Sequence, residues 1–226
     1  MPEPAPSRRA FRLRSTEVTR IEAISDAVFA LAATFLMLNM DPPKSFAELM
    51  HDLRGIVVAA VCFASLFLLW WEHHTFFRRY GLQDPLTFVL NAVLLFVVLV
   101  YVYPLRYLFG VVFGVGNLRE TIRWEQMPLL MTVYGTGFGA ISLLYAGLYA
   151  NALRQRARLQ LTAFEVLATR QCLWGNGWQA LIASASIAVA WLGGPRAAPF
   201  AGFLYFGIGV ARGLIGWHYG RLQSRT

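Results

Sequence analysis

Several apolar stretches of about twenty residues are the feature that most constrains how this chain folds. An apolar helix of about twenty residues is long enough to cross the hydrocarbon core of a bilayer. Only 14% of the 226 residues are charged, whereas a soluble domain carries about 25%. The sequence therefore predicts an all-α integral membrane protein. The excess of basic residues (20 Lys and Arg against 12 Asp and Glu) then indicates membrane topology rather than binding of nucleic acid.

Six transmembrane helices per subunit are predicted within a membrane domain at 19–218. They are placed at 19–40, 55–78, 85–109, 127–152, 176–192 and 200–218. Residues 1–18 are expected to form a flexible basic cytoplasmic tail, and 219–226 a short C-terminal one. The arginines between 153 and 172 indicate a short interfacial helix in that connection.

The distribution of positive charge predicts that both termini are cytoplasmic. Fourteen lysines and arginines fall at the N-terminus, in the turn at 78–84, in the 153–175 connection and at the C-terminal end, against six in the other loops. Cytoplasmic loops of membrane proteins carry this kind of excess. We therefore expect a multi-pass protein of the plasma or inner membrane.

The first span, RIEAISDAVFALAATFLMLNM, separates an apolar stripe from a carboxylate. Each residue of a helix turns by about 100°, so a 4-3-4 spacing keeps side chains within about 60° of one another. That stripe holds Ala27, Leu31, Thr34 and Leu38. Asp26 lies roughly 140° from Leu31 by the same geometry. A leucine stripe of this spacing is ordinarily a helix-packing surface, and the periodicity alone leaves that interpretation open.

Polar side chains of the first three spans are predicted to lie at one depth. Asp26, His74 and Asn91 fall about seven, four and six residues inside the cytoplasmic ends of their spans, hence within roughly 10 Å of one interface. Polar groups at such a depth are costly unless they are paired. We predict an interhelical network of Arg20, Ser25, Asp26, His74 and Asn91, with the Trp71 indole as a further donor. Such a network serves either as a structural clamp or as a proton relay.

Two other motifs are assigned to packing or set aside. Gly135-Thr136-Gly137-Phe138-Gly139 is superficially like a potassium-channel filter, but it sits inside a continuous apolar run, where Gly135-x3-Gly139 is typical of close helix packing. The adjacent His73 and His74 point about 100° apart and would not chelate one ion together. We therefore predict no metal site and no cofactor.

Three motifs in the first three spans occur together. They are Arg20-x4-Ser25-Asp26, Trp71-x2-His74, and Asn91 with Pro104 thirteen residues later. In combination they resemble the transmembrane protein 175 family of potassium channels, whose first-helix signature is an arginine, three residues and Phe-Ser-Asp. Ile24 stands here in place of the phenylalanine. The resemblance covers the first three spans well and the rest only as a hydrophobic outline.

The resemblance implies a homotetramer in which the first helix of each subunit lines the pore, without a carbonyl-lined filter loop. Carried over by position, the apolar constriction corresponds to Leu31 and Leu38, with Thr34 as a hydroxyl ring between them. The polar network of the family falls on Asp26, His74 and Asn91. A leucine neck of this kind gates by dewetting, and hydroxyl oxygens would favour potassium because it is less costly to dehydrate than sodium.

The predicted function is a potassium-selective or weakly selective cation channel that catalyses no reaction. Its expected partners are other copies of itself, the lipid bilayer and the permeant cations. One alternative is a proton-coupled transporter that uses Asp26 and His74 as a relay. Another is a membrane scaffold that conducts nothing, or an intramembrane enzyme, although no serine–histidine or paired-carboxylate motif supports an enzyme.

Overall fold

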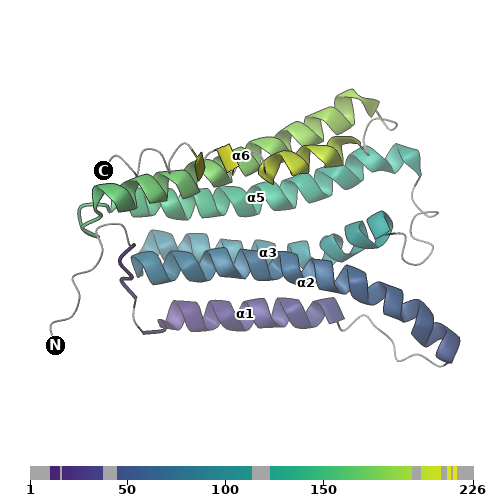
Figure 1. Ribbon diagram of the computed structural model, residues 1–226, viewed down its shortest axis with the longest axis horizontal. Helices are drawn as coiled ribbons and strands as arrows, with labels where there is room; N and C mark the ends of the chain where they lie inside the picture. The colour runs from purple at the N-terminus through teal and green to yellow at the C-terminus, as the bar shows by residue number, and fades with distance from the viewer. Residues whose placement is uncertain are drawn as a thin grey trace.

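The computed structural model describes residues 11–15, 17–37, 45–113, 123–194, 200–209, 213–214 and 216–217. All regular elements of these residues are helices, and they are α1 (Arg20–Met37), α2 (Phe46–Tyr80), α3 (Pro85–Phe113), η1 (Trp124–Gln126), α5 (Met127–Arg154), α6 (Ala163–Leu192) and η2 (Gly202–Phe206). Figure 1 shows the long helices side by side, with α1, α2 and α3 in one group and α5 and α6 in the other. Because α3 packs against α1, α2 and α5, it is the central helix that joins the two groups.

Long apolar helices support the predicted multi-pass membrane protein. Three of the described helices contain a stretch that is long and apolar enough to cross a membrane: Gly55–Tyr80 in α2, Pro85–Phe113 in α3 and Met127–Arg154 in α5. α1 lies where the first span was predicted. The last predicted span, 200–218, is described only in short helical pieces that include η2.

Two helices begin earlier than the sequence predicted. α2 starts at Phe46 rather than at 55, and α6 starts at Ala163 rather than at 176. The start of α6 is fixed by a capping box, in which Thr162 Oγ1 accepts from the Glu165 backbone N–H at 3.2 Å and the Glu165 carboxylate accepts from the Thr162 N–H at 2.9 Å. The prediction of a separate interfacial helix within 153–172 is therefore wrong, because the C-terminal part of that stretch is the beginning of α6.

The glycines of the 135–139 motif bring α5 close to its neighbours. A Cβ atom added to Gly135 would lie 2.6 Å from Ile187 Cγ1 on α6, and one added to Gly139 would lie 3.4 Å from Ala183 Cβ. A Cβ atom added to Gly137 would collide with the Tyr101 ring on α3. These contacts support the predicted role of Gly135 and Gly139 in close helix packing, because a larger side chain at Gly135 would have to displace Ile187 or α6 itself.

An N-terminal segment at 11–15 is held against the ends of α2 and α6, although the sequence predicted a flexible tail over 1–18. The backbone N–H groups of Arg14 and Ser15 donate to the Arg78 carbonyl at 3.1 and 3.3 Å. The Arg14 guanidinium lies 2.7 Å from the Glu165 carboxylate. We call this segment the N-terminal clasp. The prediction of a flexible tail is wrong for 11–15, and residues 1–10 lie outside the described part of the chain.

Candidate functional site

α1 presents two different faces to its surroundings. One face packs into the bundle through Ser25, Phe29, Ala32 and Leu36, all less than 5% exposed. The other face is open in the single chain: Leu31 is 46% exposed, Thr34 is exposed, and Phe35 is 47% exposed. This open face carries two of the three residues predicted to line a pore. The third, Leu38, lies outside the described residues.

A chain of buried hydrogen bonds joins α1, α3 and α2 beneath the first turns of α1. The Asn91 side-chain amide on α3 donates to Ser25 Oγ on α1 at 3.0 Å, and Asn91 Oδ1 lies 2.8 Å from His73 Nε2 on α2. Because Asn91 Oδ1 is an acceptor, His73 Nε2 is assigned as the protonated nitrogen. Ser25 Oγ in turn donates to the Ile21 carbonyl at 2.7 Å. All three side chains are therefore paired although they are almost fully buried.

A second contact joins α1 to α2 at the residue after Ser25. The Trp70 indole N–H donates to Asp26 Oδ1 at 2.8 Å. The Trp70 ring stacks on His74, with centroids 5.3 Å apart. We call the five residues Ser25, Asp26, Trp70, His73 and Asn91 the polar cluster.

The structure corrects the predicted network by one residue on α2. Trp71 and His74 were predicted to supply the indole and the imidazole, but the hydrogen bonds to Asp26 and Asn91 come from Trp70 and His73. Trp71 is 57% exposed. The sequence contains two overlapping Trp-x2-His pairs, and a step of one residue rotates the side chain by about 100°. The pair at 70 and 73 is the one that turns toward α1 and α3.

Arg20, the remaining predicted member, is the first residue of α1 and is exposed. The hydrogen bonds of the polar cluster do not include it among the described residues. Sequence reasoning instead missed Thr19 and Glu22, which form a reciprocal cap: the Thr19 N–H donates to the Glu22 carboxylate at 2.9 Å and Glu22 N–H donates to Thr19 Oγ1 at 3.3 Å. The Thr-x-x-Glu spacing ahead of an apolar run was the available signal.

Asp84 connects the turn between α2 and α3 to α5. Its carboxylate accepts from Thr87 Oγ1 at 2.7 Å, from Gln155 Nε2 at 2.9 Å and from Asn151 Nδ2 at 3.0 Å. Burial acts to raise the pKa of Asp84, but these hydrogen bonds outweigh it and lower the pKa to about 2. The carboxylate is therefore ionised at neutral pH and holds α5 against the start of α3.

The polar cluster is suited to positioning rather than to a reaction. It fixes one face of α1 against α2 and α3 and so determines which side chains the opposite face presents. Within the described residues no group of three His, Cys, Asp or Glu side chains could hold a metal ion. The arrangement thus offers a rigidly held helix with an open stripe of apolar and hydroxyl side chains.

Comparison with known proteins shows which family has this arrangement of helices. Three described helices long and apolar enough to cross a membrane, with a polar cluster near the start of α1, are the features of a multi-pass membrane protein. The family model for the endosomal/lysosomal potassium channel TMEM175 matches residues 20–101, the region that holds α1, α2 and most of α3. A potassium channel of Marivirga tractuosa is 36% identical over 210 residues, covering 87% of this chain and 85% of that protein. The chain therefore belongs to the TMEM175 family.

Other relatives agree with this membership. A potassium channel of Chamaesiphon minutus is 28% identical over 192 residues, covering 78% of this chain and 88% of that protein. The crystal structure of a variant of the potassium channel MtTMEM175, bound to a nanobody fusion protein, superposes with a TM-score of 0.81 at 33% identity and covers 98% of this chain and 99% of that one. A lysosomal potassium-selective TMEM175 homologue from Chamaesiphon minutus, at 22% identity and a TM-score of 0.56 over 92% of this chain and 99% of that one, is similar in fold.

Proposed function

We propose that this protein is a cation channel that conducts potassium, and that several copies of α1 line its pore. The observation that carries the proposal is the division of α1 into a buried, hydrogen-bonded face and an open face with Leu31 and Thr34. A helix at the surface of a monomer needs no such polar anchoring. A helix that must hold one face toward a shared axis does need it, because a small rotation would change the side chains in the pore.

The constriction is proposed at Leu31, Thr34 and Leu38 of each subunit, in a homotetramer. A ring of leucines gives a narrow apolar neck that controls conduction through its hydration. Thr34 Oγ1 donates to the Ala30 carbonyl at 2.9 Å. Because its hydrogen is committed to that bond, its lone pairs are left to face a partly dehydrated cation. Such a ring favours potassium over sodium modestly.

The polar cluster is proposed to act as a clamp on the pore helix. Ser25 and Asp26 are held by Asn91 and Trp70, which belong to the two neighbouring helices. A proton relay from Asp26 to His74 has no support in the described hydrogen bonds, since Asp26 accepts from Trp70 and the imidazole that joins the cluster is His73.

We propose that the N-terminal clasp and the C-terminus lie on the cytoplasmic side. The membrane is proposed to be a plasma or inner membrane. Support comes from charge at this end of the bundle. The clasp carries Arg12 and Arg14, α2 ends with Arg78 and Arg79, and the turn after α5 carries Arg156 and Arg158. An excess of arginines is typical of the cytoplasmic side.

The proposal is tested by measuring ion flux into liposomes that contain the purified protein. We expect potassium flux to exceed sodium flux, and Leu31→Ala to raise the flux or to reduce the preference for potassium, because it widens the neck. Leu143→Ala is the matched control, since Leu143 is 61% exposed on α5 and the substitution removes the same atoms away from α1. Flux unchanged by Leu31→Ala, or no flux under any gradient, would contradict the proposal.

A further inference from the structure

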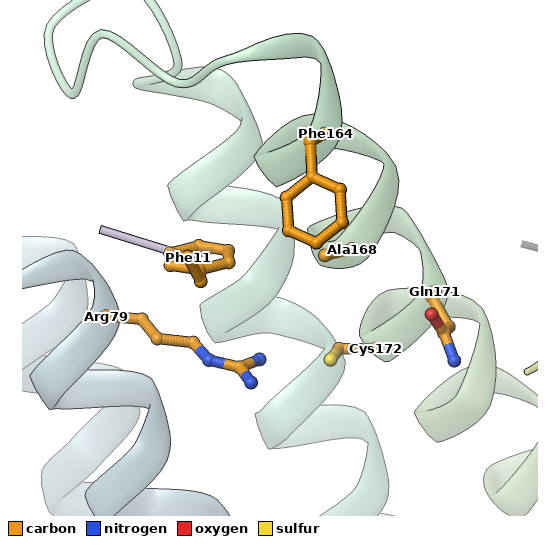
Figure 2. A pocket seen from close by; sticks show the side chains of 6 residues that line it. All are labelled: Phe11, Arg79, Phe164, Ala168, Gln171 and Cys172. Carbon is orange, nitrogen blue, oxygen red and sulfur yellow. The ribbon is translucent and has the colours of Figure 1, made fainter. Parts of the chain in front are cut away.

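A pocket of about 410 Å³ lies where the N-terminal clasp meets α2 and α6. It is lined by Phe11, Arg79, Phe164, Ala168, Gln171 and Cys172. Figure 2 shows the Arg79 side chain extending from α2 toward Cys172 on α6, with the rings of Phe11 and Phe164 beside the same space. The polar cluster lies elsewhere in the bundle, so the proposed pore does not account for this pocket.

The charge facing this pocket is positive. The Arg79 guanidinium lies 4.9 Å from the centre of the Phe11 ring, and no ion pair joins it to a carboxylate of the described residues. The nearby Glu165 carboxylate is paired with the Arg14 guanidinium at 2.7 Å. Arg14 Nε also donates to the Leu159 carbonyl at 2.8 Å. Gln171 adds an amide to the lining. A guanidinium without a carboxylate partner can bind a phosphate group through two parallel N–H donors.

The pocket lies at one end of an apolar stretch that is long enough to cross a membrane, where bilayer headgroups would lie. Arg79 is the residue before the last of the apolar stretch Gly55–Tyr80, so its guanidinium lies where that stretch ends. On α6 an exposed apolar stripe runs from the pocket along the helix, toward its C-terminal end. It follows Gln171 at helical spacing and consists of Trp174, Trp178 and Leu181, which are 58%, 46% and 55% exposed. A cation at headgroup depth above an apolar stripe matches a molecule with a phosphate and an acyl chain.

We propose that this pocket binds the phosphate of an anionic phospholipid, with Arg79 as its cationic partner and an acyl chain along the stripe of α6. This inference goes beyond the proposed channel and does not depend on it. The bound headgroup would contact Phe11, which belongs to the clasp that leads directly into α1. The lipid would thereby stabilise the clasp against α2 and α6.

Lipid binding is tested on the full-length protein by native mass spectrometry in detergent, with phosphatidic acid as the probe and phosphatidylcholine as the reference lipid. We expect phosphatidic acid to bind, and Arg79→Gln to weaken its binding about tenfold, as the loss of one charge-assisted contact implies. Arg156→Gln is the control, because it removes an exposed arginine from the same end of the bundle but not from the pocket. Equal affinity of Arg79→Gln and wild type would overturn the proposal, as would equal weakening by Arg156→Gln.

The place of binding is tested through Cys172, which lines the pocket, with the buried Cys62 as an internal reference. In vesicles of phosphatidylcholine, added phosphatidic acid should slow the modification of Cys172 by N-ethylmaleimide. Protection by millimolar inorganic phosphate as strong as that by the lipid would reject a lipid and assign the site to soluble phosphates.

If Arg79→Gln fails to fold, Ala168→Trp, which fills the pocket but keeps the charge, should abolish phosphatidic acid binding. Undiminished binding to Ala168→Trp would overturn the proposal.

Discussion

Trp70 and Trp71 are chemically identical neighbours that differ by about 100° of rotation around α2. Trp70 donates its indole N–H to Asp26, whereas Trp71 is 57% exposed. The contribution of each indole to stability should therefore differ sharply, although each substitution removes the same atoms.

We predict that Trp70→Phe lowers the stability of the protein by about 1 kcal/mol, because it leaves Asp26 without its indole donor while keeping an aromatic ring in place. Trp71→Phe should change it by only a few tenths of a kcal/mol, as exposed substitutions generally do. Thermal unfolding of both variants in one detergent measures the difference. An equal or larger loss for Trp71→Phe would show that the predicted pair at 71 and 74 is the one that matters.

The sequence predicts the depth of the polar residues better than the direction in which they point. Depth follows from counting residues along a helix of known rise. The predicted network accordingly includes Ser25 and Asn91, whose side chains are hydrogen-bonded. Direction depends on which stripe of α2 is buried. The stripe with Cys62, Leu66 and His73 is buried and the adjacent one with Phe63, Phe67 and Trp71 is exposed, but both are apolar. Hydrophobicity alone therefore could not distinguish His73 from His74.

At the scale of elements, polar side chains decide where helices begin and how they are joined. Most helices were predicted in place because long apolar stretches are a strong signal. The first half of α6 was missed because it is too polar to be counted as part of a span, and the capping box of Thr162 and Glu165 that starts it was overlooked. Contacts that join distant elements, such as those of Arg14 to Glu165 or Asp84 to Asn151, have no local sequence signal at all.

Asp84 allows a test of how α2, α3 and α5 are joined. Because its folded-state pKa of about 2 lies below the ordinary value of 3.8, its ionised form stabilises the fold above about pH 4. That stabilisation is lost as pH falls through the folded pKa. We predict that wild type exceeds Asp84→Asn in melting temperature at pH 7 and that the difference is clearly smaller at pH 3. A difference that is unchanged or larger at pH 3 would contradict this account.

Glu125 provides the control for Asp84, because its carboxylate is exposed in η1. Glu125→Gln should leave the melting temperature nearly unchanged at both pH values.

At the scale of the whole molecule, we propose that other copies of the chain complete the open face of α1. We predict that the protein purified in mild detergent forms a homotetramer, with a protein mass four times the 25.4 kDa of one chain. Native mass spectrometry measures this mass directly. A predominantly monomeric protein that still conducts potassium would be incompatible with a pore lined by several copies of α1.

The central claim, that Thr34 faces a water-filled pore, is tested most directly by placing a cysteine there. In a Cys62→Ser, Cys172→Ser background, Thr34→Cys is compared with Ser184→Cys. Both positions are exposed, and both hydroxyls donate to the carbonyl four residues earlier, at 2.9 Å and 3.0 Å. We predict that a positively charged methanethiosulfonate reagent modifies Thr34→Cys and blocks potassium flux in liposomes, while flux through Ser184→Cys persists. A Thr34→Cys protein that the reagent does not modify, or that conducts normally once modified, would contradict the assignment of α1 as the pore helix.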